Sequence, residues 1–111
     1  MKARKPLVCT GAAIIAMSVF APAQAQDNAT LGKNLARDVC AECHAVEPGV
    51  MQSPNPDSPA FQALANIPGI NTMAIKVWLQ SPHRSMPLLV LDGPEMEALS
   101  AYIISLKPVS P

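Results

Sequence analysis

The stretch Cys40-Ala41-Glu42-Cys43-His44 decides how this chain of 111 residues is interpreted. Two cysteines stand three positions apart, and a histidine follows the second directly. This is the spacing at which a protein attaches haem covalently. The two thiols add to the two vinyl groups of one porphyrin, and the histidine is then placed to ligate the iron from one face. The motif therefore predicts a covalently bound haem held by Cys40, Cys43 and His44.

Two other interpretations of this motif find less support in the sequence. A redox-active Cys-x-x-Cys pair of the thioredoxin type needs a βαβ context, and no segment here has the pattern of a strand. A structural zinc site needs two more thiols or imidazoles at a characteristic spacing. The chain has only Cys9 and His83 besides the motif. Haem is therefore the favoured cofactor.

The first 25 residues have the pattern of a secretory signal peptide. A basic segment at 1–5 precedes an uncharged run at 7–20, and Ala23-Gln24-Ala25 fits the A-x-A cleavage pattern. A retained membrane anchor is the alternative, but the uncharged run has 14 residues, whereas a span needs about 20. We expect cleavage after Ala25, a mature domain at 26–111, export to the periplasm, and no stable membrane insertion afterwards.

The predicted mature chain is small and acidic. It has 86 residues, of which five are basic and eight acidic, so its net charge is −3. Because it lacks a basic stripe, nucleic acid is not an expected partner. A domain of this size often needs a disulfide, a metal or a cofactor to complete its core, and only three aromatic residues are present. A bound haem would supply the missing apolar centre.

The pattern along 26–111 predicts an all-α domain. Apolar residues at helical spacing predict a helix over about 30–40, leading into the haem motif. Shorter helices are expected over 60–66 and 71–81, with Asn71 or Thr72 as a cap and with Ala74, Val77 and Trp78 on one face. Four prolines at 47–59 predict an ordered loop between the motif and the second helix.

The last helix has the clearest start. Asp92 stands three residues before Glu95, which resembles a capping box, and Pro94 lies in the first turn. An apolar stripe follows, and Pro108 ends the helix; the stripe consists of Met96, Leu99, Ile103 and Leu106, with Tyr102 beside it. Gly32 in the first helix could meet Tyr102 where the two helices cross, because glycine permits close approach.

These features resemble the class I c-type cytochromes over nearly all of 26–111. The shared features are a helix leading into Cys-x-x-Cys-His, a proline-rich loop, a Met-Pro pair and the segment Ala101-Tyr102-Ile103. The stretch 81–87, Ser-Pro-His-Arg-Ser-Met-Pro, is similar to the His-x-x-Met-Pro segment of small single-haem bacterial members. The resemblance implies a small cytochrome c-like fold of three to four helices around one covalently bound haem c.

The resemblance also implies the ligands. Cys40 and Cys43 would form thioether bonds, and the Nε2 atom of His44 would ligate the iron. A methionine before the last helix would be the sixth ligand, and Met86 matches that position, with His83 as the rival. The family fixes the motif histidine through a proline carbonyl in the following loop, for which Pro54 or Pro56 is the expected match. Trp78 is expected at the haem edge or, equally, in ordinary helix packing.

The function that follows is electron transfer rather than catalysis. We expect a periplasmic electron carrier with His/Met ligation that meets its redox partner proteins in transient contacts. The alternative is a haem subunit of a larger periplasmic dehydrogenase or oxidase complex. A gas-binding or peroxidatic haem protein, which needs a labile Met86, and a scaffold without haem are less favoured.

Overall fold

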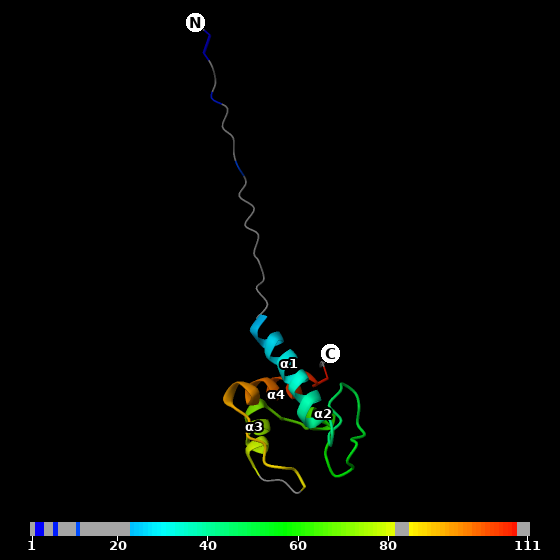
Figure 1. Ribbon diagram of the computed structural model, residues 1–111. Coiled ribbons are helices and arrows are strands. Elements are labelled where there is room, and N and C mark those ends of the chain that lie inside the picture. The colour runs from blue at the N-terminus through cyan, green and yellow to red at the C-terminus, as the bar shows by residue number, and fades with distance from the viewer. Residues whose placement is uncertain (1, 4–5, 7–10, 12–22, 82–84, 109–111) are drawn as a thin grey trace.

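The computed structural model describes residues 2–3, 6, 11, 23–81 and 85–108, and its regular structure within these ranges is entirely helical (Figure 1). In chain order the elements are α1 (Ala23–Leu35), the π-helical segment η1 (Ala36–Cys40), α2 (Phe61–Ala65), α3 (Thr72–Gln80) and α4 (Gly93–Ser105). The predicted all-α class is confirmed. Of the helices so described, none combines the length and apolarity needed to cross a membrane.

The first helix starts earlier than predicted and changes its winding before the haem motif. α1 begins at Ala23 rather than near residue 30, and η1 continues it to Cys40. A π-helical turn is rare and occurs mostly at functional sites. Here it ends on the first motif cysteine, and it buries Ala36 and Cys40. The widened turn therefore determines where the first thiol of the motif lies.

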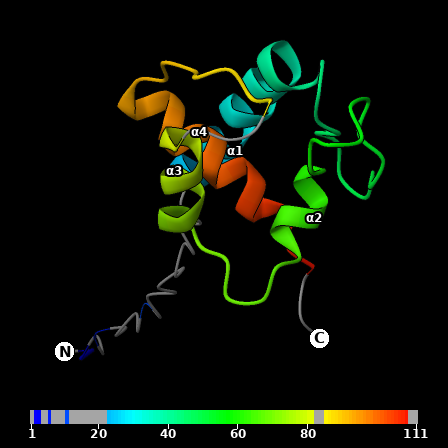
Figure 2. The ribbon, with the colours of Figure 1, turned by 90° about the horizontal axis from the view of Figure 1, so that it is seen from below.

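The crossing of α1 and α4 forms the centre of the fold (Figure 2). A Cβ atom built on Gly32 would lie 1.9 Å from the carbonyl oxygen of Ala98 and 2.8 Å from the Cβ of Tyr102. Only glycine permits this approach, so the predicted meeting of Gly32 and Tyr102 is confirmed. Because η1 continues α1, the crossing also fixes the position of the haem motif.

The capping box at the start of α4 is present as predicted. The backbone N–H of Glu95 donates to the Asp92 side chain at 2.8 Å, and the N–H of Asp92 donates to the Glu95 side chain at 3.0 Å. The predicted stripe forms the core face of this helix, where Leu99, Tyr102 and Ile103 are all buried. The capping box also gives partners to the backbone N–H groups of Asp92 and Glu95, which the hydrogen bonds within the helix do not reach.

The predicted face of α3 is wrong in part. Ile75, which is 1% exposed, is the residue that α3 buries in the core. Val77 is 51% exposed and Trp78 is 36% exposed, so these two side chains do not belong to the buried face of α3. Asn71 caps the helix as predicted, since its side-chain oxygen accepts from the backbone N–H of Ala74 at 3.0 Å.

Hydrogen bonds order the loop between the motif and α2 by joining its middle to the residues at and after the motif. The N–H of Ala45 donates to Ser53 Oγ at 2.9 Å, and the N–H of Asn55 donates to the Cys43 carbonyl at 3.1 Å. The Tyr102 hydroxyl, from the far end of the chain, donates to the Val46 carbonyl at 2.5 Å. The predicted ordered loop is confirmed, and it is attached directly to the segment that follows His44.

Candidate haem-binding site

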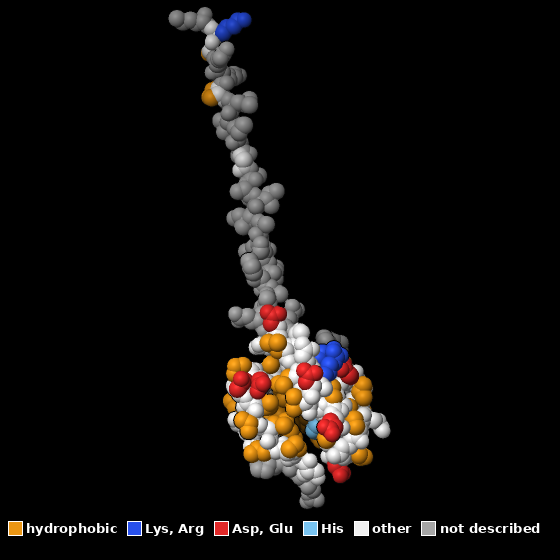
Figure 3. All heavy atoms as spheres, in the orientation of Figure 1, with side chains coloured by type: hydrophobic (Ala, Val, Ile, Leu, Met, Phe, Trp, Pro, Cys, Tyr) orange, Lys and Arg blue, Asp and Glu red, His pale blue; other side chains and the backbone are white. Residues whose placement is uncertain are grey.

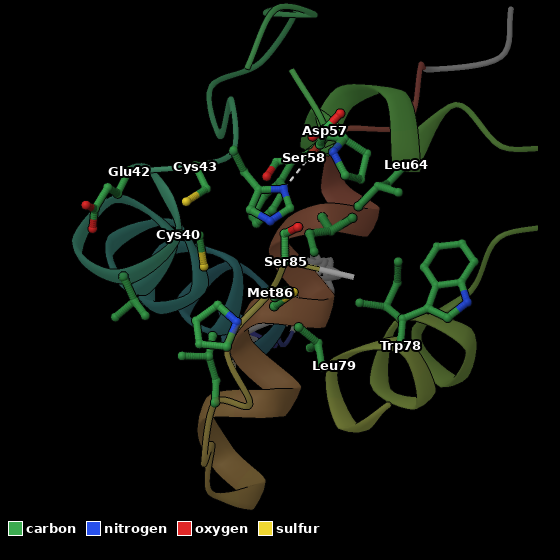
Figure 4. Close-up of a pocket in the computed structure, with 18 residues that line it drawn as sticks. Cys40, Glu42, Cys43, Asp57, Ser58, Leu64, Trp78, Leu79, Ser85 and Met86 are labelled. Carbon is green, nitrogen blue, oxygen red and sulfur yellow. Dashed lines mark hydrogen bonds between the residues drawn. The ribbon is translucent and has the colours of Figure 1, made fainter. Parts of the chain in front are cut away.

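A pocket of about 410 Å³ lies between η1, the loop, α3 and the segment before α4 (Figure 4). Its volume falls within the range of about 300–1,000 Å³ that is usual for small-molecule and cofactor sites. Most of its lining is apolar, and the apolar side chains come from every element around it: Val39, Phe61, Leu64, Ile75, Leu79, Leu89 and Ile103. The pocket is therefore suited to a large apolar ligand.

The haem motif forms one wall of this pocket. Cys40, Cys43 and His44 all line it. The backbone N–H groups of Cys43 and His44 both donate to the Cys40 carbonyl, at 3.2 and 2.9 Å, so the motif forms a tight turn at the end of η1. Both cysteines are free thiols. One short turn thus brings two thiols and an imidazole to the same cavity.

The imidazole of His44 has a fixed orientation. Its Nδ1 atom lies 2.7 Å from the carbonyl oxygen of Pro59. Since a carbonyl only accepts, Nδ1 carries the proton and Nε2 keeps its lone pair for a ligand. The Phe61 ring lies 5.6 Å away between centroids and supports the imidazole from the side. The ring is therefore prepared to ligate through Nε2.

The proline that holds His44 differs from the prediction. Pro59, rather than Pro54 or Pro56, supplies the carbonyl. The N–H of Phe61 donates to the Ala45 carbonyl at 2.9 Å, and this bond brings the end of the loop back beside the motif. The number of residues in the loop did not reveal this return point. The signal for Pro59 that the sequence offered is its place as the last proline of the loop, two residues before α2 begins at Phe61.

Burial gives the Cys40 side chain the character of an apolar group. Cys40 is 8% exposed, and desolvation raises the pKa of its thiol to about 11. The thiol therefore stays neutral within the apolar lining. Within the described residues, no group of three or more His, Cys, Asp or Glu side chains is arranged to hold a metal ion directly.

Met86 reaches the same pocket from a different part of the chain. It is half-buried and lies between Ser85 and Pro87, which also line the pocket. By contrast, Met51 and Met73 are 55% and 67% exposed, and neither they nor Met96 of α4 line the pocket. The structure thus brings Met86 together with Cys40, Cys43 and His44. His83, the rival ligand, lies outside the described residues.

Three other residues at this pocket, Ser85, Glu42 and Asp57, were not predicted from the sequence. Ser85 has a backbone φ of +66°, and a serine carries no signal for that conformation. Glu42 and Asp57 place two carboxylates at the pocket, although the sequence shows them only as surface charges. Trp78, which was expected at the haem edge or in ordinary helix packing, lines the pocket while remaining 36% exposed, so it lies at the edge of the cavity.

The residues present fit a covalently held haem. Two free thiols at the motif spacing, an imidazole with Nε2 available and a thioether border one apolar cavity. Thiols suit thioether bonds to porphyrin vinyl groups, and imidazole and thioether are haem-iron ligands. No other donor set of comparable chemistry surrounds the cavity among the described residues.

Comparison with known proteins gives one curated relative. Over 77 residues the chain is 35% identical to cytochrome c-552 of Bradyrhizobium diazoefficiens, and the match covers 69% of this chain and 73% of the relative. No family model matches the chain, and no solved structure matches it.

Proposed function

The chain belongs to the c-type cytochromes, and we propose that it is a small single-haem member of class I that carries electrons in the periplasm. The observation that supports this most strongly is the shared pocket of the motif residues and Met86. A haem that is held on both faces and shielded from water suits electron transfer, and the presence of His44, Met86 and apolar side chains around one pocket supports this assignment.

In this proposal the motif residues tether and ligate one haem c. Cys40 and Cys43 form the thioether bonds, and His44 ligates through Nε2 while the Pro59 carbonyl keeps the proton on Nδ1. A hydrogen bond of this kind orients a ligating imidazole and makes it more basic. When bound, the haem supplies one-electron chemistry at its iron.

Met86 would occupy the remaining axial position. A thioether ligand raises the reduction potential of haem iron relative to a second imidazole. It also closes the iron to dioxygen and peroxide, which favours a carrier over an enzyme. Leu89 and Ile103 line the same pocket, and apolar side chains of this kind would help to exclude water around a bound haem.

The surface around the pocket favours brief contact with a basic partner. The only Asp, Glu, Lys or Arg side chains that line it in the described chain are Glu42 and Asp57, and both are acidic. Figure 3 shows acidic side chains scattered among apolar ones over the face in view. Such a surface attracts positively charged partners at long range and raises association rates. Signal cleavage after Ala25 would release the carrier into the periplasm.

The sulfur–iron absorption band in the near infrared tests the proposed ligation. The chain is produced in a host that attaches haem, and the oxidised protein is measured as wild type and as Met86→Ala. We expect the band in the wild type and its complete loss in the variant, because the alanine offers no sulfur. Met51→Ala is the matched control, since Met51 is exposed and does not line the pocket. A band that survives in Met86→Ala would overturn the assignment.

A further inference from the structure

Ser85, the residue directly before Met86, has a strained backbone. Its φ of +66° lies in the left-handed region, where the other positive angles of the described chain belong to Gly49 and Gly69, at +74° and +75°. A residue with a side chain is uncommon in this region, and a β-branched residue there is a genuine outlier. Strain of this kind clusters at functional sites.

Part of the chain after Met86 does not pack against the body of the protein. Leu88 and Val90 are 70% and 94% exposed, so packing does not hold these side chains against the body. Pro87 fixes its own φ and restricts Met86 to extended conformations. The left-handed conformation of Ser85, directly before Met86, is therefore one local feature that sets the direction in which Met86 leaves the turn.

We propose that Ser85 is a positioning residue, whose left-handed backbone turns Met86 into the haem pocket. Both residues line this pocket, as His44 does, and Figure 4 shows Ser85 and Met86 next to each other. The proposal rests on the proposed ligation by Met86. It assigns to Ser85 a backbone role, so what matters at this position is tolerance of the left-handed conformation rather than the hydroxyl group.

Competition by imidazole measures how firmly Met86 is held. Imidazole binds the ferric haem-loaded protein only by displacing the sixth ligand, so its Kd falls when that ligand is weakened. Ser85→Val and Ser85→Thr are β-branched and disfavour the left-handed region; we expect them to bind imidazole about tenfold more tightly. Ser85→Gly and Ser85→Asn tolerate this region and should stay within about threefold of the wild type.

Matched controls separate this effect from general damage to the segment. Leu88→Val introduces the same β-branched side chain at an exposed position three residues later, and we expect it to leave the imidazole Kd unchanged. Circular dichroism at 222 nm checks that each variant keeps its helices. If valine prevents haem loading, the comparison of threonine with asparagine at Ser85 decides, because both are polar but only threonine is β-branched.

The outcomes distinguish this proposal from the one on which it rests. Equal imidazole affinity across the Ser85 series overturns the positioning role. So does a series that follows the hydroxyl group, with threonine like the wild type and glycine unlike it. Met86→Ala gives the upper limit of imidazole affinity. If that variant binds imidazole no more tightly than the wild type, ligation by Met86 fails, whereas a strong gain with a flat Ser85 series refutes only the role of Ser85.

Discussion

The two sides of the candidate haem site are built in different ways. On the His44 side, the imidazole follows a helix end and donates from Nδ1 to the Pro59 carbonyl, and the loop after it accepts a hydrogen bond from Tyr102. On the Met86 side, Leu88 is 70% exposed, and Ser85, directly before the proposed ligand Met86, has a left-handed backbone. The proposed ligand His44 is thus held by contacts with several elements of the fold, whereas the proposed ligand Met86 lies in a segment with fewer such contacts. Damage to the first side should therefore cost global stability, and damage to the second should cost ligation alone.

Gly32→Ala should give the largest loss of stability, and it acts on the His44 side of the site. The new Cβ would lie 1.9 Å from the Ala98 carbonyl oxygen, so α1 must move away from α4 and carry η1 with it. We expect a loss of about 3 kcal/mol in the free energy of unfolding, as for strong overpacking of a core, measured by urea denaturation of the haem-loaded protein.

The matched control is Gly93→Ala at the start of α4. A Cβ there meets nothing within 4 Å, so the free energy of unfolding should change by less than about 0.5 kcal/mol. Equal stability of the two alanine variants would show that the helix crossing does not support the motif.

Tyr102→Phe should weaken the same side by a smaller amount. The change removes the hydroxyl that donates to the Val46 carbonyl at 2.5 Å, and Tyr102 is 3% exposed. A buried acceptor that loses its donor costs about 1–3 kcal/mol, and we expect urea denaturation to show a loss in this range. Leu88→Ala, on the Met86 side, should leave the free energy of unfolding nearly unchanged. A larger loss in Leu88→Ala than in Tyr102→Phe would reverse the comparison.

Glu47→Gln should give the smallest effect, and one that depends on pH. Arg37 donates to the Glu47 carboxylate at 2.5 and 3.0 Å, and this hydrogen bond lowers the pKa of Glu47 from its ordinary value of 4.5. A carboxyl whose pKa is lowered by folding stabilises the fold above its unfolded pKa and loses this contribution as the pH falls through its folded pKa.

The melting temperature as a function of pH checks this expectation. The wild type should melt slightly above Glu47→Gln at pH 7, and the difference should shrink below pH 4.5 and also in high salt, because the pair is exposed. A difference that grows as the pH falls would contradict the sign of the linkage.

The parts of the molecule that were predictable from the sequence are those fixed by local chemistry. Asp92 and Glu95 cap α4 through contacts three residues apart, and Gly32 indicates a close helix crossing through the absence of a side chain. These features need no knowledge of distant segments, so the residue pattern was sufficient to predict them.

The remaining features depend on how distant segments meet. The choice of Pro59 over Pro54 or Pro56 follows from the bond between Phe61 and Ala45, which joins the two ends of a loop. The face that α3 buries is decided by its contact with α4. The left-handed backbone of Ser85 contradicts the local preference of serine, so the sequence argued against it.

The coordination of the iron tests the central claim most directly. X-ray absorption at the iron edge, measured on the haem-loaded wild type in solution, counts the nitrogen and sulfur atoms bound to the metal. Ligation by His44 and Met86 predicts five nitrogens, four from the porphyrin and one from the imidazole, together with one sulfur. Six nitrogens and no sulfur would contradict the account and would make His83 the first candidate for the second axial ligand.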